Sequence, residues 1–199
     1  TLDYHPSQAG RILRTGVTRV MGIITAPPST HPFTYAFFPH LLEGVGECAA
    51  ANGYDVLWIT ADSLDRQPSQ YEALFKSRRV DGLIDAWLWL GRSRIGQLQA
   101  GGHPFVLIGH PDDESLPHVD AANRDGAWQV GRAFVTRGYA PVAYVGFLEA
   151  PASRDRLEGL QRGLAEAGQT IRPEHVTFLE REQSHLGQEQ LGHASMRRW

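Results

Sequence analysis

The sequence predicts an α/β fold in which parallel sheets are covered by helices, and three observations lead to that prediction. Short apolar runs recur along the chain, each preceded by a glycine or a polar turn. Between them lie stretches with the apolar spacing of amphipathic helices. Glycine stands before the next run in ANGYDV, AGGHPFV, TRGYAPV and EAGQTI, where a helix commonly ends in a left-handed residue. A repeated order of helix, glycine and strand is typical of parallel sheets.

The expected strands are the apolar runs themselves. Runs rich in Val, Ile and Leu are typical of strands that are buried on both faces. They cover residues 20–25, 54–60, 81–87, 104–109, 141–147 and 175–179. Helical spacing is clearest over residues 41–49, 128–135 and 157–167.

The composition indicates a globular protein of one or two lobes. The 199 residues are 42% apolar, which is enough to bury a sizeable core. The net charge of -3 argues against binding of nucleic acid or anionic lipid by the bulk of the surface. The first 20 residues differ, because they hold three arginines and a single aspartate. The start of the chain is therefore basic and the body acidic.

Neither export nor membrane insertion is expected. The lone Cys48 cannot form an internal disulfide, and the chain opens with polar TLDYHPSQ instead of a charged start and an apolar segment. No apolar run approaches the roughly 18 residues that a membrane span needs. We therefore expect a soluble cytoplasmic protein without a signal peptide.

The stretch GHPDDESLPHVDAAN, residues 109–123, interrupts the alternation and predicts a crossover between two lobes. We expect a linker over 1–16, a first lobe over 17–112 and a second over 118–199. The second lobe would hold two clear strands and three helices, and the chain stops at SMRRW within a helical pattern. We therefore expect an incomplete second lobe, cut from a longer protein.

Common signatures of catalysis and cofactor binding are absent. The sequence holds no phosphate-binding loop, no H-E-x-x-H, no G-x-S-x-G and no paired cysteines, and its nine histidines are scattered. We expect no metal, no cofactor and no enzymatic activity. GVGECA, residues 44–49, superficially matches a dinucleotide fingerprint, but it lies inside an expected helix. Close helix packing by its small residues is the interpretation that we favour.

Ligand-contacting residues are expected beyond the carboxyl ends of the strands. Phe33 and Tyr35 follow the first strand in TAPPSTHPFTYAFF, where they could face a ligand or attach a helix to the core. Trp87 and Trp89 follow the third strand and could stack on a sugar or a planar base, or be buried.

Further candidates are polar. Arg154 and Arg156 follow Ser153, an expected helix N-cap, where cations oppose the helix dipole. Such arginines suit an anionic or polyhydroxyl ligand, although pairing with Asp155, Glu158 or Glu149 is the alternative.

His110 and Asp112 follow the fourth strand, and they could bind hydroxyl groups of a ligand or belong to a solvated loop. Asn123 could cap the helix that begins near residue 125, or join its end to a ligand.

Several segments resemble LacI/GalR-family transcriptional regulators. YHPSQAGRILRTG, residues 4–16, resembles the segment that joins the helix-turn-helix of these proteins to their core, and VMGII continues into the first core strand. Further similar segments are HPF at 31–33, GY at 53–54, VDGLI at 80–84, RGY at 137–139 and RLEGL at 156–160.

The resemblance implies a periplasmic-binding-protein-like core, type I, with two lobes, a homodimer and a small effector in the cleft between the lobes. Many members sense sugars, and some sense nucleobases or nucleosides. Phe33 falls in an effector-contacting loop, and Arg156 matches the arginine that commonly holds the effector. Leu13 matches the leucine that is wedged into the minor groove, while Arg11 and Arg14 fit contacts to phosphate.

Two departures from the family pattern affect what is expected. No helix-turn-helix is present, so this chain by itself should not bind an operator with useful affinity. Ala122 stands where the family usually has Asp before Asn123, which removes a polar group from the effector site.

We interpret the chain as the effector-binding and dimerisation core of a LacI-family DNA-binding repressor that senses a small sugar-like ligand. An alternative is an extracytoplasmic solute-binding protein of a transporter, which would share the fold and the cleft residues. The segment at 4–16 argues against it, and the first residues of the full gene would separate the two. An α/β enzyme is a third possibility, for which no set of nucleophile, base and orienting residue is found.

Overall fold

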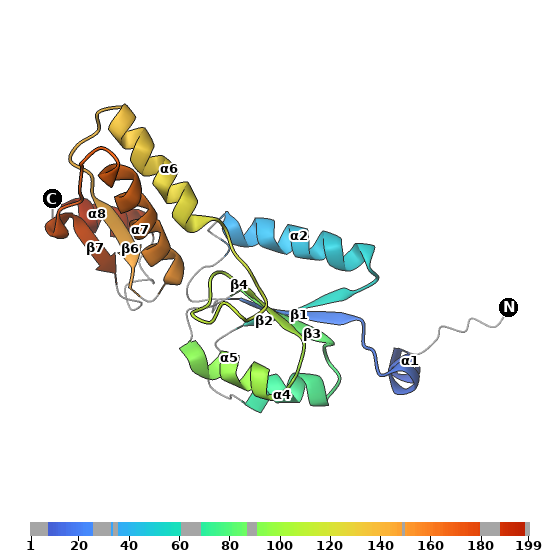
Figure 1. The fold of residues 1–199 in the computed structure, drawn as a ribbon. Coiled ribbons are helices and arrows are strands. Elements are labelled where there is room, and N and C mark those ends of the chain that lie inside the picture. The colour runs from blue at the N-terminus through green and yellow to red at the C-terminus, as the bar shows by residue number, and fades with distance from the viewer. Residues whose placement is uncertain are drawn as a thin grey trace. The chain divides into compact units, whose positions relative to one another are not determined.

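The computed structural model describes residues 8–25, 33, 36–60, 69–86, 91–148, 150–179 and 188–197. The chain divides into two compact units, unit 1 over Thr1–Ile108 and unit 2 over Gly109–Trp199 (Figure 1). No described helix combines the length and the apolar character that a membrane crossing requires.

Unit 1 contains parallel strands in the order β2-β1-β3-β4. These strands are β1 (Val20–Thr25), β2 (Asp55–Thr60), β3 (Gly82–Asp85) and β4 (Phe105–Ile108). Each lies within a predicted apolar run, which confirms that these runs form strands. The expectation of burial is wrong for β2, where Asp55, Val56 and Trp58 are exposed because β2 is an edge strand of the sheet. β1 lies between β2 and β3, and its Ile23 and Ile24 are fully buried.

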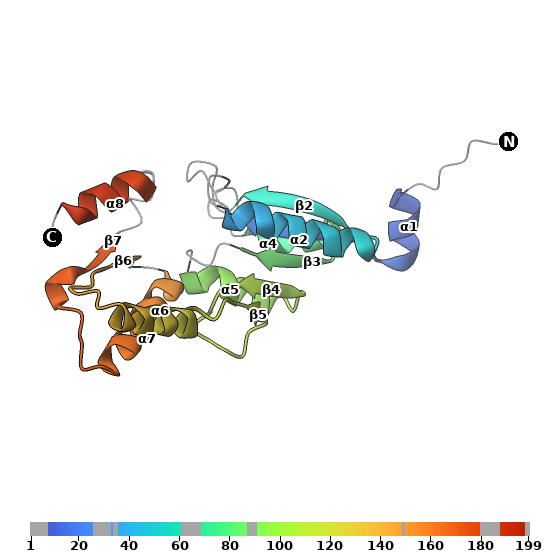
Figure 2. The ribbon, with the colours of Figure 1, turned by 90° about the horizontal axis from the view of Figure 1, so that it is seen from above.

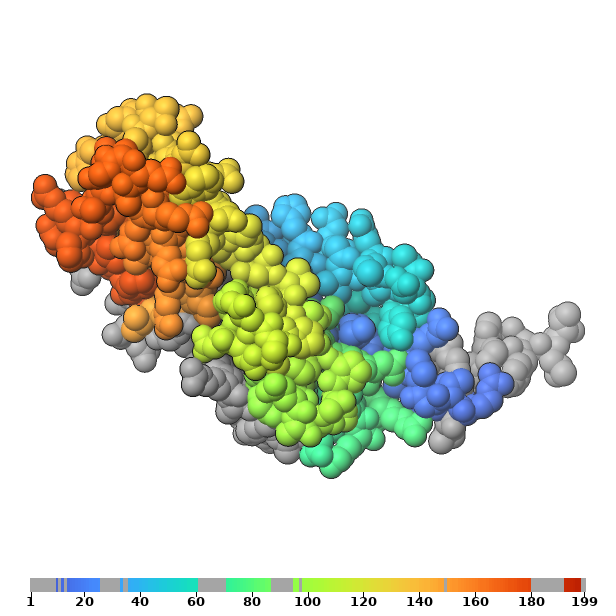
Figure 3. Space-filling view, in the orientation of Figure 1, coloured from blue at the N-terminus to red at the C-terminus, as the bar shows by residue number. Residues whose placement is uncertain are grey.

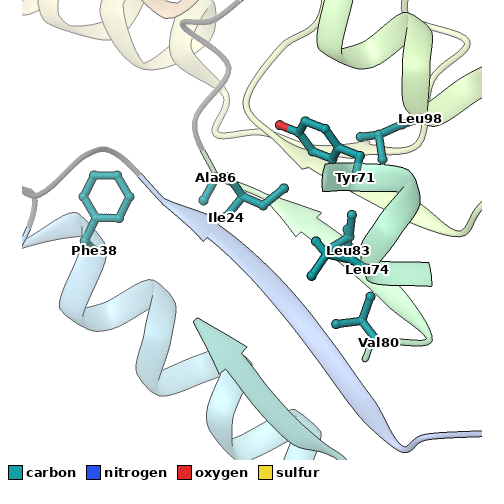
Figure 4. Close-up of a cluster of buried hydrophobic side chains, with 8 residues drawn as sticks. All are labelled: Ile24, Phe38, Tyr71, Leu74, Val80, Leu83, Ala86 and Leu98. Atoms are coloured by element: carbon teal, nitrogen blue, oxygen red, sulfur yellow. The ribbon is translucent and has the colours of Figure 1, made fainter. Parts of the chain in front are cut away.

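Helices cover both faces of this sheet. One face carries α2 (Phe37–Ala51), and the other carries α4 (Ser69–Lys76) and α5 (Gly91–Ala100) (Figures 1 and 2). The main buried cluster joins strands to α4 and α5, with Leu83, Leu74 and Leu98 among its members (Figure 4). From α2, only Phe38 is buried.

Helix α1 (Gln8–Thr15) precedes β1, and side chains of the turn before β3 bind both α1 and the residues that join it to β1. The guanidinium of Arg78 donates from Nη1 to the carbonyl oxygen of Ile12 at 3.1 Å. The carboxylate of Asp81 accepts from the backbone N–H groups of Thr18 and Arg19, each at 2.8 Å, and from the Thr18 hydroxyl. These bonds fix the chain where it passes from α1 into the sheet.

Unit 2 pairs β6 (Tyr144–Phe147) in parallel with β7 (Val176–Leu179). Its other elements are β5 (His118–Val119), α6 (Asn123–Thr136), α7 (Pro151–Ala165), a short 3-10 helix (Pro173–His175) and α8 (Gln188–Met196). Leu160, Leu164 and Ile171 form its buried cluster. The predicted glycines after helices, Gly53 and Gly102 in unit 1 and Gly138 and Gly168 in unit 2, all have positive φ, which confirms that prediction.

Helices α6 and α7 pack so closely that glycine is required between them. A Cβ on Gly159 would lie 2.0 Å from the carbonyl oxygen of Arg124, and one on Gly163 would lie 2.3 Å from that of Trp128. The same packing was predicted for Gly44 and Gly46, and there it is wrong. Both lie in a helix as predicted, but a Cβ on either would meet no atom of the described residues within 4 Å. Gly44 instead lines a pocket together with residues of β1 and β3, and α2 forms part of the surface of unit 1 (Figure 3).

Two predicted helix starts are also wrong. α7 begins at Pro151, with Ala150 as its N-cap, because proline suits the first helical position. The hydroxyl of Ser153 instead accepts from the backbone N–H of Phe147 at 3.0 Å. α6 begins at Asn123 itself, with Ala122 as its N-cap, so the Asn123 side chain is not the cap and makes other contacts.

Candidate functional site

Two predicted site residues meet in unit 2. Asn123 is the first residue of α6, and Arg156 lies in the second turn of α7. The Nε–H of Arg156 donates to Oδ1 of Asn123 at 2.8 Å. Asn123 is buried, with 9% of its surface accessible, whereas Arg156 is exposed. The packing of α6 on α7 thus brings together residues that are 33 positions apart in the sequence.

A pocket of about 490 Å³ opens beside this pair. Its volume lies within the range of roughly 300–1,000 Å³ that is typical of small-molecule sites. Asn123, Arg156 and Tyr144 bring polar side chains to its lining. The remaining lining residues are small or apolar, namely Ala121, Ala122, Gly126, Ala127, Val130, Phe134, Ala143 and Leu160. A ligand here would meet an apolar wall and a few polar groups gathered at one side.

Tyr144 is a lining residue that the sequence did not single out. Its hydroxyl donates to the carbonyl oxygen of Ser153 in α7. Burial raises the pKa of this hydroxyl, while the bond to Ser153 and the charge of Arg156 act in the opposite direction. The hydroxyl therefore stays neutral at physiological pH. The feature of the sequence that could have identified Tyr144 is its polar hydroxyl within the otherwise apolar run PVAYVGF.

The carboxylates next to Arg156 in the sequence are paired elsewhere. Arg124 Nη2 lies 2.6 Å from Asp155 Oδ1 and 3.0 Å from Glu158 Oε2. The alternative pairing of Arg156 with Asp155 or Glu158 is therefore not observed, and Glu149 lies outside the described residues. Arg154 is exposed and does not line the pocket.

His110 and Asp112 also lie away from the pocket lining. His110 Nε2 is 3.6 Å from Glu114 Oε1, and its ring meets that of His118 edge to face. Among the described residues, ligand atoms of His110, Asp120 and Asp155 lie within 4.8 Å of one another, as a metal ion would require. The guanidinium of Arg124 on Asp155 places a positive charge there, which disfavours a second cation.

Phe33 lies in unit 1, near the carboxyl ends of β1 and β2. It is exposed, and its ring centroid is 5.0 Å from that of Trp58, edge to face. The indole of Trp58 donates to the hydroxyl of Thr25, and 48% of Trp58 is exposed. The sequence placed Trp58 within a strand and gave no indication of this contact. Tyr35, Trp87 and Trp89 lie outside the described residues.

The predicted DNA-contacting residues belong to α1. Arg14 is exposed in its last turn. The backbone of Arg11 and Leu13 is helical, but their side chains lie outside what the structure describes. α1 precedes the amino end of β1, whereas Phe33 follows its carboxyl end.

Comparisons with known proteins agree with the fold and with the resemblance. A family model described as "Periplasmic binding proteins and sugar binding domain of LacI family" matches residues 18–193. The chain is 25% identical over 164 residues to the HTH-type transcriptional regulator MalR of Streptococcus pneumoniae serotype 4, covering 82% of this chain and 50% of that protein. It is 30% identical over 141 residues to the regulator RafR of Escherichia coli, covering 70% of this chain and 41% of that protein. The chain thus spans about half the length of the curated relatives that it matches.

Solved structures show the same fold. A complex of the transcriptional regulator CelR with cellobiose matches with a TM-score of 0.76 and 22% identity, over 100% of this chain and 62% of that chain. The transcription regulator CcpA of Lactococcus lactis matches with a TM-score of 0.73 and 23% identity, over 90% of this chain and 63% of that chain.

The family model covers nearly the whole described chain, and the regulators named above share its fold. The fold is that of type I periplasmic binding proteins and the cores of LacI-type regulators. The chain belongs to the family of periplasmic binding proteins and LacI-family sugar-binding domains.

Proposed function

We propose that the chain is the effector-binding and dimerisation core of a LacI-family transcriptional repressor, which senses a small sugar-like ligand in the cytoplasm and performs no catalysis. The observation that carries this proposal is the Arg156–Asn123 pair at the side of an otherwise apolar pocket. A guanidinium offers paired donors to hydroxyl or anionic oxygens, and an apolar wall suits the CH-rich face of a sugar.

The relatives support a sugar-like effector. The matched CelR structure is a cellobiose complex, and the matching family model is described as a sugar-binding domain. The rings of Phe33 and Trp58 pack edge to face, and both residues are exposed. They supply an aromatic surface in unit 1 that would suit the same class of ligand.

Regulation needs no chemistry beyond differential binding. An effector shifts an equilibrium between two conformations only by its difference in affinity for them, and couplings of about 1–3 kcal/mol are typical. In the full-length protein, the α1 residues Leu13, Arg11 and Arg14 would contact operator DNA.

A homodimer is supported by an exposed apolar surface on unit 1. Phe37 on α2 and Val56 and Trp58 on β2 are 56%, 38% and 48% exposed. Exposed apolar side chains of this kind suit contact with a second copy of the chain.

The test of the effector proposal is thermal stability of the purified protein across a panel of sugars, sugar phosphates and nucleosides. A specific ligand at 100 times its Kd stabilises by about 2.7 kcal/mol, because it binds only the folded state. We expect at least one compound to raise the Tm of the wild type and to lose this effect in Arg156→Ala.

Arg137→Ala is the matched control, since Arg137 is an exposed arginine at the other end of α6. It should keep the full ligand effect. A ligand shift that survives Arg156→Ala would overturn the proposed site, and a panel without any shift would overturn the proposed effector class.

A further inference from the structure

The side-chain amide of Asn123 joins two charged residues. Its Nδ2 donates to both oxygens of Asp120, at 3.1 and 3.2 Å, and to the carbonyl oxygen of Ala121 at 3.2 Å. Its Oδ1 accepts from Nε of Arg156 at 2.8 Å. A carboxylate, an amide and a guanidinium thus form a continuous chain of hydrogen bonds.

The chemistry of the two flanking groups permits a single orientation of the amide. An ionised carboxylate only accepts hydrogen bonds, and a guanidinium only donates them. Rotating the amide by 180° would set Oδ1 against the oxygens of Asp120 and the NH₂ group against the Nε–H of Arg156. Both bonds would become repulsive, so Asp120 acts together with Arg156 and the carbonyl oxygen of Ala121 to select the orientation in which Oδ1 of Asn123 faces Arg156.

The other carboxylates near Arg156 are already paired. Arg124 binds Asp155 and Glu158, and Arg162 Nη2 lies 3.0 Å from Asp125 Oδ1. Within the described residues, Arg156 forms no ion pair, and Asn123 is the partner of its Nε. The guanidinium is therefore held at one edge, and its charge is not neutralised by an acidic neighbour.

We propose that Asp120 is a positioning residue, which acts through Asn123 to hold the Arg156 guanidinium with its Nη groups available to a ligand. The ligand would bring two adjacent oxygen acceptors, as vicinal hydroxyls or a carboxylate do, because a guanidinium binds such pairs with parallel hydrogen bonds. The proposal depends on the proposed effector site and adds Asp120 to it. Asp120 is exposed, so it can be replaced without opening the core.

The first experiment needs no effector. ¹⁵N NMR of the arginine Nε–H groups reports whether the bond between Arg156 and Asn123 is formed, and Arg156→Lys assigns the signal. We expect a slowly exchanging Arg156 signal in the wild type that is lost in Asn123→Ala and Asp120→Ala. Asp120→Asn should restore it, because an amide oxygen can still accept from Asn123 Nδ2.

Asp113→Ala is the matched control. Asp113 is an exposed aspartate of the same segment, and its carboxylate accepts hydrogen bonds only from Ser115 among the described residues. It should leave the Arg156 signal unchanged. A signal that persists in Asp120→Ala would overturn the positioning role, whatever the protein binds.

The second experiment uses the panel compound with the largest thermal shift. We expect Asp120→Ala to weaken its binding about tenfold, as the loss of a hydrogen bond to a charged group commonly does. In an Asn123→Ala background the same substitution should have no further effect, because the connection to Arg156 is already broken. Equal effects in both backgrounds would overturn the proposal.

The two experiments separate the two proposals. A panel without any shift, together with an Arg156 signal that depends on Asp120, would overturn the proposed effector class and leave the positioning role standing. Binding that depends on Arg156 but not on Asp120 would overturn the positioning role alone.

Discussion

Glycines in two helices of this protein have opposite surroundings. In unit 2, Gly159 and Gly163 lie against the backbone of α6, so close that a Cβ would overlap a carbonyl oxygen. In unit 1, Gly44 and Gly46 lie in α2, and no atom of the described residues lies within 4 Å of a Cβ on either. Small residues at helical spacing therefore permit close packing, but they do not ensure that a second helix is there.

The difference extends to the polar groups of the two units. In unit 2, the hydroxyl of Tyr144 on β6 bonds to α7. In unit 1, Tyr71 of α4 is 4% exposed, and its hydroxyl has no hydrogen-bond partner within the described residues. Ser195 of α8 in unit 2 is also buried with no hydrogen-bond partner for its hydroxyl among the described residues, so the contrast concerns these two tyrosines and not the units as wholes.

The largest effect is expected for Gly159→Ala. A methyl group there must displace the α6 backbone at Arg124, and overpacking of this kind costs about 3 kcal/mol of unfolding free energy. Urea unfolding followed by circular dichroism would measure the loss. Unchanged stability would mean that α6 and α7 separate readily, and the contrast with α2 would fail.

A smaller change in unfolding free energy is expected when the hydroxyl group of Tyr144 or of Tyr71 is removed. Tyr144→Phe should cost about 1 kcal/mol, because it removes a hydrogen bond and leaves the Ser153 carbonyl without it. Tyr71→Phe should be neutral or stabilising, because the hydroxyl that it removes has no partner among the described residues. Matched urea titrations of both variants would measure the difference, and equal losses would contradict the contrast.

The Tyr144 hydroxyl also predicts a dependence on alkaline pH. Burial raises the pKa of Tyr144 in the folded protein above that of the unfolded chain, about 10. Its contribution is therefore fully present below that value and lost as pH rises through the folded pKa. Tyr144→Phe should show a smaller loss of stability in this range than the wild type does.

The smallest effect, opposite in sign, is expected for Gly44→Ala. Alanine stabilises an exposed helix position by about 0.5–1 kcal/mol relative to glycine, and no atom of the described part of the chain blocks the methyl group here. The same urea titration would detect the gain. Destabilisation would show that another surface, such as a second copy of the chain, covers this side of α2 in solution.

The sequence predicted the framework of the fold well. The apolar runs of β1 and β3 coincide with strands because residues inside a parallel sheet that is covered on both faces must be apolar. The run of β2 also forms a strand, but as an edge strand it exposes Val56 and Trp58. The glycines after helices were predictable because few other residues adopt positive φ there. The packing on α2 was predicted wrongly, because a run of small residues carries no information about its partner.

The candidate site was predictable only in part. Arg156 and Asn123 could be singled out because each lies near the end of an expected strand or helix, where ligands of parallel sheets bind. Their hydrogen bond, and the contribution of Asp120, depend on the close packing of α6 on α7. Trp58 was missed because its exposure depends on what covers the edge strand β2.

Helix α1 is attached only weakly to the rest of unit 1 by the hydrogen bond from Arg78. Residues 78 and 81 belong to one short turn before β3, so a single turn restrains both the end of α1 and the start of β1. A hydrogen bond of this kind contributes about 1 kcal/mol net, so the free energy that attaches α1 through Arg78 is only about twice thermal energy. α1 therefore has a preferred direction relative to the sheet of unit 1, but a strongly charged surface could redirect it without unfolding the sheet.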